Sequence, residues 1–299
     1  MTEDVLGSYW TTAGPAVPAG APFPLRGPEW SPFDWTDRCA QAARVGLRGL
    51  GLWHEDLRHL LERHSLVQLG RIFTDAGLEY LELEFLMDWY LPDDDPRRSA
   101  AQAITQMLFE AAAVMGAHHV KVGNIFGVPV THGRLVEAFA GLCAQAATAH
   151  GAPVVYELMP SDVTVHSLDA AIALVTGAGA RNGGLALDTW HMGKLGIRPD
   201  MLAAIPRHHP VYVELSDGRR HDMADLNEET TSYRLLPGDG EFDLVDYVAA
   251  LHDIGYHGPW GVEVLSAELR ALPIETAFDR MASTTMAVLA AAETHSATD

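Results

Sequence analysis

Short apolar runs alternate with longer helix-type runs along the whole chain, and few folds accommodate such a pattern. The runs typical of strands cover residues 5–10, 46–53, 80–85, 118–124, 153–159, 184–190, 210–217 and 260–266. Strands that are apolar on both faces are typical of a parallel sheet covered by helices. Eight strand–helix units in 299 residues predict an α/β fold of the (β/α)8 TIM barrel type. We expect residues 1–299 to form a single domain.

Composition and charge exclude several classes of partner. The chain carries 20 Lys and Arg against 40 Asp and Glu, which disfavours nucleic acid as a partner. Long uncharged apolar stretches and a signal-peptide pattern are absent from the sequence, which disfavours a membrane partner. Cys39 and Cys143 are predicted to be buried thiols in a reducing, cytoplasmic environment. The sequence leaves open a homo-oligomer.

Four acidic residues end the four last predicted strands. Each follows an apolar run at a similar depth: Glu157, Asp188, Glu214 and Glu263. In a barrel, chemistry gathers at the carboxyl ends of the strands, and neighbouring strands lie roughly 5 Å apart. Like charges brought that close raise one another's pKa or bind a cation. Because oxygen ligands suit Mn²⁺ or Mg²⁺, we predict one divalent metal ion held by these four carboxylates.

Three further residues are candidates for substrate binding. Trp53 and His54 end the second predicted strand, where a ring beside an imidazole suits the apolar face and hydroxyls of a sugar. Lys121 ends the fourth predicted strand. Its charge is expected either to offset the acidic residues or to hold a substrate oxygen. The segment 13–30, rich in Pro and Ala, follows the first strand and is predicted to be an active-site loop.

Several motifs together resemble the sugar phosphate isomerase/epimerase family of xylose isomerase-like TIM barrels. They are YELMP (156–160), LALDTWH (185–191), VYVELSDGRR (211–220), LLPGDGEFDL (235–244) and GYHGPWGVEVLS (255–266). The resemblance implies one divalent metal at Glu157, Asp188, position 214 and Glu263. The family usually has His-x-x-Asp where this chain has Glu214-Leu-Ser-Asp217. Glu214 either binds the metal or contacts substrate; we expect it to be a ligand, which would disfavour zinc.

The resemblance also implies a reaction. Glu157 and Glu263 would be the catalytic acid and base, while His191 and Arg220 would bind a small carbohydrate substrate. The expected activity is a sugar isomerase or epimerase that transfers protons through a metal-bound enediolate. The alternative is a metal-dependent lyase on a keto-sugar, cyclitol or 3-keto-glycoside, of the dehydratase or deglycosidase type.

Two other classes remain as weaker alternatives. A DNA-repair nuclease on this barrel would need three metals, further histidine ligands and a basic face, which the net charge of −20 disfavours. A non-catalytic sugar-binding barrel is the other.

Overall fold

The computed structural model describes residues 3–18, 21, 27–149 and 151–296. Residues 19–20 and 22–26 belong to the predicted active-site loop at 13–30, so that part of the prediction lies outside the described residues.

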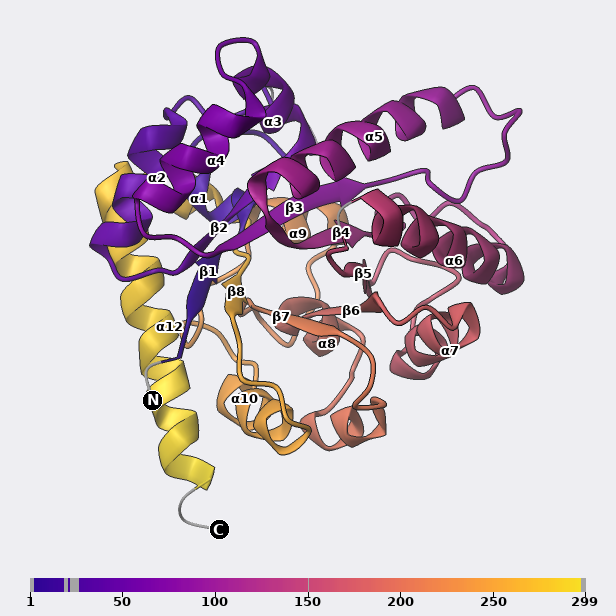
Figure 1. Cartoon of the computed structure of the whole chain (residues 1–299). Helices are drawn as coiled ribbons and strands as arrows, with labels where there is room; N and C mark the ends of the chain where they lie inside the picture. The colour runs from indigo at the N-terminus through magenta and orange to yellow at the C-terminus, as the bar shows by residue number, and fades with distance from the viewer. Residues whose placement is uncertain (1–2, 19–20, 22–26, 150, 297–299) are drawn as a thin grey trace.

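Eight parallel strands pair in sequence order and close into a barrel (Figure 1). They are β1 (Val5–Gly7), β2 (Gly49–Trp53), β3 (Tyr80–Leu86), β4 (Ala117–Val122), β5 (Val154–Glu157), β6 (Gly183–Asp188), β7 (Val211–Leu215) and β8 (Trp260–Val262). Each overlaps one of the strands predicted from the sequence, and the predicted (β/α)8 barrel is confirmed.

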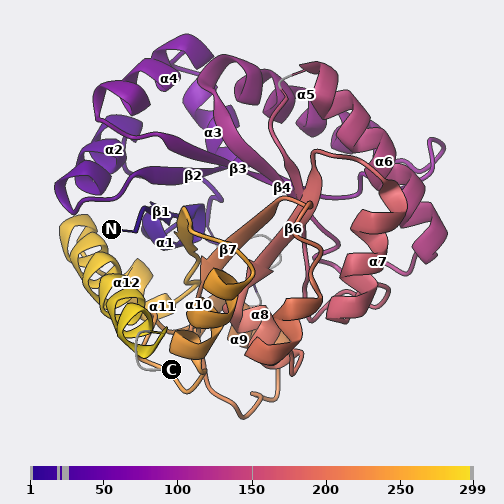
Figure 2. The ribbon, with the colours of Figure 1, turned by 60° about the horizontal axis from the view of Figure 1, so that its bottom comes forward.

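The α-helices form a ring around the strands, which is clearest when the barrel is viewed near its axis (Figure 2). They are α1 (Tyr9–Thr12), α2 (Trp35–Arg44), α3 (His54–Leu61), α4 (Leu66–Asp75), α5 (Arg98–Met115), α6 (His132–Ala149), α7 (Leu168–Ala178), α8 (Thr189–Lys194), α9 (Leu226–Ser232), α10 (Leu244–Asp253), α11 (Ala267–Arg270) and α12 (Ile274–Ser296). A 3₁₀ helix, η1 (Pro199–Ala204), precedes β7. None of the described helices is long and apolar enough to cross a membrane.

Local sequence signals explain several helix ends. The Ser65 hydroxyl accepts a hydrogen bond from the backbone of Gln68, whose side chain accepts one from the Ser65 backbone, so a capping box begins α4. The Ser167 hydroxyl caps α7 by accepting from the Ala170 backbone. Helix α5 ends at Gly116, which has a φ of 74°, a conformation that glycine adopts at little cost.

The interior of the barrel is unusually polar. A TIM barrel is normally filled by branched apolar side chains, whereas Glu82, His119 and Lys121 are buried here on β3 and β4. Tyr212 on β7 is buried beside them, with its ring centroid 3.8 Å from that of His119. Gly261 makes room for this layer, since a Cβ there would lie 2.2 Å from the Tyr212 hydroxyl. The apolar core lies mainly between the strands and the outer helices.

Candidate active site

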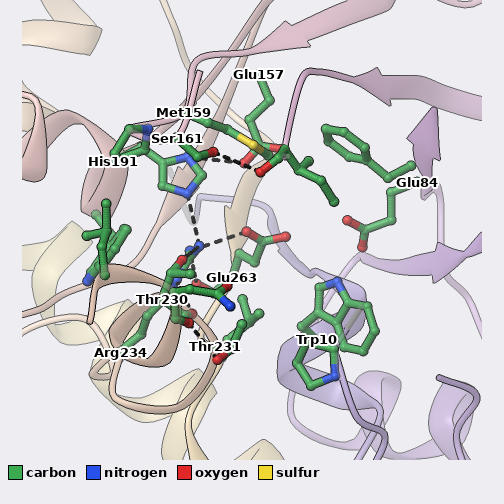
Figure 3. Close-up of a pocket in the computed structure, with 18 of the residues that line it drawn as sticks. Trp10, Glu84, Glu157, Met159, Ser161, His191, Thr230, Thr231, Arg234 and Glu263 are labelled. Carbon is green, nitrogen blue, oxygen red and sulfur yellow. Dashed lines mark hydrogen bonds and ion pairs between the residues drawn. The ribbon is translucent and has the colours of Figure 1, made fainter. Parts of the chain in front are cut away.

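A pocket of about 460 Å³ opens at the carboxyl ends of the strands. One wall is apolar and includes Trp10, Trp53, Phe85, Ile125, Met159 and Leu265. The ionisable residues that line the pocket include Glu84, Glu157, His191, Arg234 and Glu263 (Figure 3). Helix α9 contributes Asn227, Thr230 and Thr231. The pocket therefore combines a charged floor with an aromatic and aliphatic wall.

The structure brings the four predicted carboxylates together. Parallel pairing of β6 and β7 places Asp188 directly beside Glu214, while Glu157 ends β5 and Glu263 follows β8. All four are buried, and each offers an oxygen atom within 4.8 Å of the others. The register of the strands, which the sequence pattern predicted, is what makes them converge.

Arg234 reaches this cluster from the segment that follows α9. Its Nη1 lies 2.6 Å from Asp188 Oδ2 and 3.3 Å from Glu263 Oε2, and its Nη2 lies 2.9 Å from His191 Nε2. Figure 3 shows the guanidinium between His191 and Glu263. Because an arginine can only donate, His191 Nε2 must accept, and a neutral ring then carries its proton on Nδ1. Burial, Arg234 and Lys121 all lower the pKa of His191, which keeps the ring neutral.

Lys121 lies beneath the pocket instead of on its surface. Its Nζ is 2.7 Å from Glu214 Oε1, 3.0 Å from Glu263 Oε1 and 3.0 Å from Glu84 Oε2. The side chain is fully buried, and it is not among the residues that line the pocket. Of the two expectations for this lysine, the geometry matches the one in which it offsets the acidic residues.

Burial raises the pKa of both Glu157 and Glu214 well above the usual range of a carboxyl. Lys121 opposes this rise, whereas Glu263 adds to it. Burial also lowers the pKa of Lys121, but its contacts with Glu214 and Glu263 outweigh that effect and raise it overall. Burial and the neighbouring carboxylates therefore outweigh the effect of Lys121 on Glu157 and Glu214.

Burial also raises the pKa of two neighbouring acids. Burial raises the pKa of Glu84 to about 8, although Lys121 opposes the shift. Burial likewise raises the pKa of Asp188 to about 6, although Arg234 opposes it. Additional positive charge would stabilise the ionised form of these carboxylates.

The donor atoms fit a divalent cation. Within the described part of the chain, Glu157 Oε1 and Glu214 Oε2 are buried and have no hydrogen-bond partner. Buried carboxylate oxygens rarely lack a partner, and an ion bound between them would supply one. These two oxygens are therefore available as metal ligands. His191 Nδ1 lies 3.3 Å from Glu157 Oε1 without hydrogen-bond geometry. A set of carboxylate oxygens suits a hard cation.

Two residues predicted to bind substrate lie elsewhere. Arg220 is exposed, and its guanidinium donates to Asp243 Oδ1 at 2.8 Å, so its position outside the pocket differs from the prediction. The sequence around it is a loop, in which no strand register fixes where a side chain points. His54 is buried behind the pocket, where its Nδ1 accepts from the Phe85 backbone at 3.4 Å. Trp53 lines the pocket, and its contact with substrate stays a prediction.

Two residues near the carboxylates were missed from the sequence. Arg234 was missed because it follows a short helix with no strand pattern. Glu82 lies two residues before Glu84 on β3, a period-two pattern that places both side chains on the inner face and could have identified Glu82. Only a closed barrel brings these residues to the carboxylates of β5 to β8.

A closed barrel with an acidic pocket at the carboxyl ends of its strands places the chain among the TIM-barrel proteins with a site at that face. Residues 39–284 match the model of the xylose isomerase-like TIM barrel family, and the chain belongs to this family.

Curated relatives of the chain are enzymes. A 3-dehydroshikimate dehydratase of Pseudomonas aeruginosa is 27% identical over 77% of this chain, which spans 36% of that enzyme. An inosose isomerase of Bacillus velezensis is 24% identical over 79% of this chain and 84% of the isomerase. The relatives thus include isomerases and a dehydratase.

Solved structures share the fold. A protein described as IOLI with a bound zinc atom superposes with a TM-score of 0.80 at 20% identity, over 96% of this chain and 98% of that one. A D-allulose 3-epimerase of Methylomonas sp. superposes with a TM-score of 0.67 at 16% identity, over 97% of each chain.

Proposed function

We propose that this protein is a divalent-metal-dependent isomerase or epimerase of a small carbohydrate. The observation that carries the proposal is the convergence of Glu157, Asp188, Glu214 and Glu263, of which Glu157 and Glu263 line the pocket. Two of the four, Glu157 and Glu214, each have one buried oxygen without a hydrogen-bond partner among the described residues. The isomerase and epimerase relatives support the same class of reaction. In the proposal these four residues hold the metal. A bound divalent ion would polarise a substrate carbonyl and so acidify the adjacent carbon.

Glu157 and Glu263 are the proposed proton carriers. Both line the pocket, one at the end of β5 and the other just after β8. The raised pKa of Glu157 suits a group that takes a proton from carbon and holds it near neutral pH. Glu263 then delivers a proton to the substrate. Arg234 and the neutral His191 orient substrate oxygens, and the apolar wall excludes water from the reacting carbon.

A first experiment tests the metal. Metal content is measured by plasma mass spectrometry for the wild-type protein, for a chelator-treated sample reloaded with Mn²⁺ and for Asp188→Ala. We expect about one ion per wild-type chain and a large loss in the variant, because Asp188 is one of the four converging carboxylates. Equal metal content in all three samples would contradict the proposal.

A second experiment tests the proton carriers. We expect Glu157→Gln and Glu263→Gln each to lower turnover by at least about 10²–10⁴-fold, the usual contribution of general acid–base catalysis. Circular dichroism and thermal melting check that both variants stay folded. A variant that turned over at nearly the wild-type rate would show that its residue does not carry a proton.

A dehydratase is the second candidate. The apolar wall of the pocket includes Trp10, Trp53, Phe85 and Leu265. A hexose, which is covered with hydroxyl groups, does not require so much aromatic and aliphatic surface. The match to a 3-dehydroshikimate dehydratase also supports a dehydratase function. Loss of water from 3-dehydroshikimate is followed by the absorbance of its aromatic product, and formation of that product would favour this candidate over the isomerase.

A further inference from the structure

Lys121 differs from Arg234 in how it is held. Arg234 follows α9 and lines the open pocket, where its guanidinium pairs with Asp188 and Glu263. Lys121 lies on β4 inside the barrel with no exposed surface. A fully buried ammonium must keep its carboxylate partners, because an unpaired buried charge costs several kcal/mol. Lys121 is therefore a permanent counter-ion of the carboxylate cluster.

Glu214 is the carboxylate most closely tied to that counter-ion. Its Oε1 accepts from Lys121 Nζ at 2.7 Å and from the Ser8 hydroxyl at 2.7 Å. These two donors occupy one oxygen and leave Oε2 buried without a partner among the described residues. Glu214 is thus fixed in orientation, with a single oxygen free to face a cation.

The charges of the carboxylates, the proposed cation and Lys121 nearly balance one another. Four carboxylates around one divalent cation leave an excess of two negative charges in a buried site. The Lys121 ammonium cancels one of them at Glu214, and the Arg234 guanidinium offsets the other beside Asp188 and Glu263. We propose that Lys121 and Glu214 act as one unit, in which the ammonium neutralises the carboxylate so that Glu214 binds the metal as an effectively uncharged oxygen donor. This inference rests on the proposed metal site and makes Lys121 a positioning residue that sets metal affinity.

A double-mutant cycle tests whether the two residues act as a unit. Mn²⁺ affinity is measured by isothermal titration for wild type, Lys121→Met, Glu214→Gln and the double variant. Glu214→Gln leaves an ammonium near the ion without its closest carboxylate, so we expect affinity to fall at least about tenfold. The double variant removes both charges, and we expect its affinity to return to within about threefold of wild type.

Thermal melting without metal supplies a readout independent of activity. Lys121→Met leaves the carboxylates without their counter-ion, so we expect a lower melting temperature and a larger upward shift on adding Mn²⁺ than in wild type. If this variant does not fold, Glu214→Gln and the double variant still decide the question. The exposed pair Arg198 and Asp200 supplies matched controls, Arg198→Met and Asp200→Asn, which should leave Mn²⁺ affinity unchanged.

Two results would overturn the inference in different ways. A wild-type protein that binds no Mn²⁺ removes the metal site and with it the proposed function. A wild-type protein that binds Mn²⁺, with a double variant as weak as Glu214→Gln, leaves the proposed function intact and shows that Lys121 does not act with Glu214.

Discussion

Each buried carboxylate of the site has two oxygens, and their partners decide what the residue can do. Asp188 Oδ1 accepts from the Trp190 backbone at 2.7 Å, and its Oδ2 accepts from Arg234 at 2.6 Å, so this residue is held in place. Glu157 Oε1 is buried without a hydrogen-bond partner among the described residues. Glu157 therefore keeps an oxygen that can approach a substrate or an ion, whereas donors hold both oxygens of Asp188.

His54 makes the stability of the protein depend on pH. Burial lowers its pKa to about 4, and the Phe85 backbone N–H donates to its Nδ1, so the ring is neutral in the native protein. In the unfolded chain the pKa of His54 is higher, about 6.5. The stability that depends on neutral His54 is therefore complete above about pH 6.5 and is lost as the pH falls towards 4.

We expect His54→Gln to reduce this acid sensitivity. The slope of unfolding free energy against pH between 6.5 and 4 should fall by up to about 1.4 kcal/mol per pH unit, the value for one proton. Urea unfolding at several pH values measures the slope. Identical slopes in the variant and the wild type would show that His54 does not take up this proton.

The residues that sequence reasoning located share a physical property. Asp188 and Glu214 end apolar strands, and the strict two-residue period of a strand fixes where their side chains point. Arg234 and Arg220 lie in a connection with no such period, and the sequence alone could not show which of them turns inward. Ser8 and Lys121 were visible as strand residues, but their shared contact with Glu214 exists only once the barrel closes.

At the scale of elements, helix α9 covers one side of the pocket and is anchored by a buried ion pair. Lys194 on α8 lies 2.6 Å from Glu229 on α9, and both side chains are nearly inaccessible. Glu229 Oε2 also accepts from the Met223 backbone at 3.0 Å. This pair therefore fixes the helix that carries Thr230 and Thr231 into the pocket.

We expect Lys194→Met to loosen α9. Removing one partner of a buried pair leaves the other charge uncompensated, which typically costs about 3–5 kcal/mol. Amide hydrogen exchange in 222–233 should quicken. KM should rise more than kcat falls, because α9 lines the proposed substrate pocket and carries none of the proposed proton carriers. Lys194→Met with Glu229→Gln should recover part of the loss. Unchanged exchange in the single variant would contradict an anchoring role.

In the whole molecule, charged side chains lie in the centre of the barrel, and the apolar core lies between the strands and the outer helices. The helices and the outer faces of the strands share the apolar core, whereas the upper interior holds Glu84, Lys121 and the four converging carboxylates. The sequence predicted the barrel because its alternation is local. The balance of charge inside it depends on contacts between strands far apart in the chain, so the sequence left open whether Lys121 offsets the acidic residues or holds a substrate oxygen.

The pocket as a whole is compatible with either an isomerase or a lyase. Both reactions begin when a carboxylate such as Glu157 removes a proton from the carbon next to a carbonyl. In an isomerase the proton returns to carbon, whereas in a lyase a neighbouring substituent leaves. The charged floor serves either outcome, and the apolar wall with Trp10 and Trp53 favours a substrate with a bulky or unsaturated part.

Incubation in D₂O with ketohexoses, inososes and 3-keto-glycosides, followed by NMR, distinguishes the two outcomes. An isomerase or epimerase exchanges the abstracted proton with solvent, so we expect deuterium on carbon in a rearranged sugar of unchanged formula. Glu157→Gln should abolish that incorporation if Glu157 is the base. Release of water or of an aglycone, without an epimer, would replace the isomerase assignment by the lyase, and the apolar wall would then bind the group next to the bond that breaks.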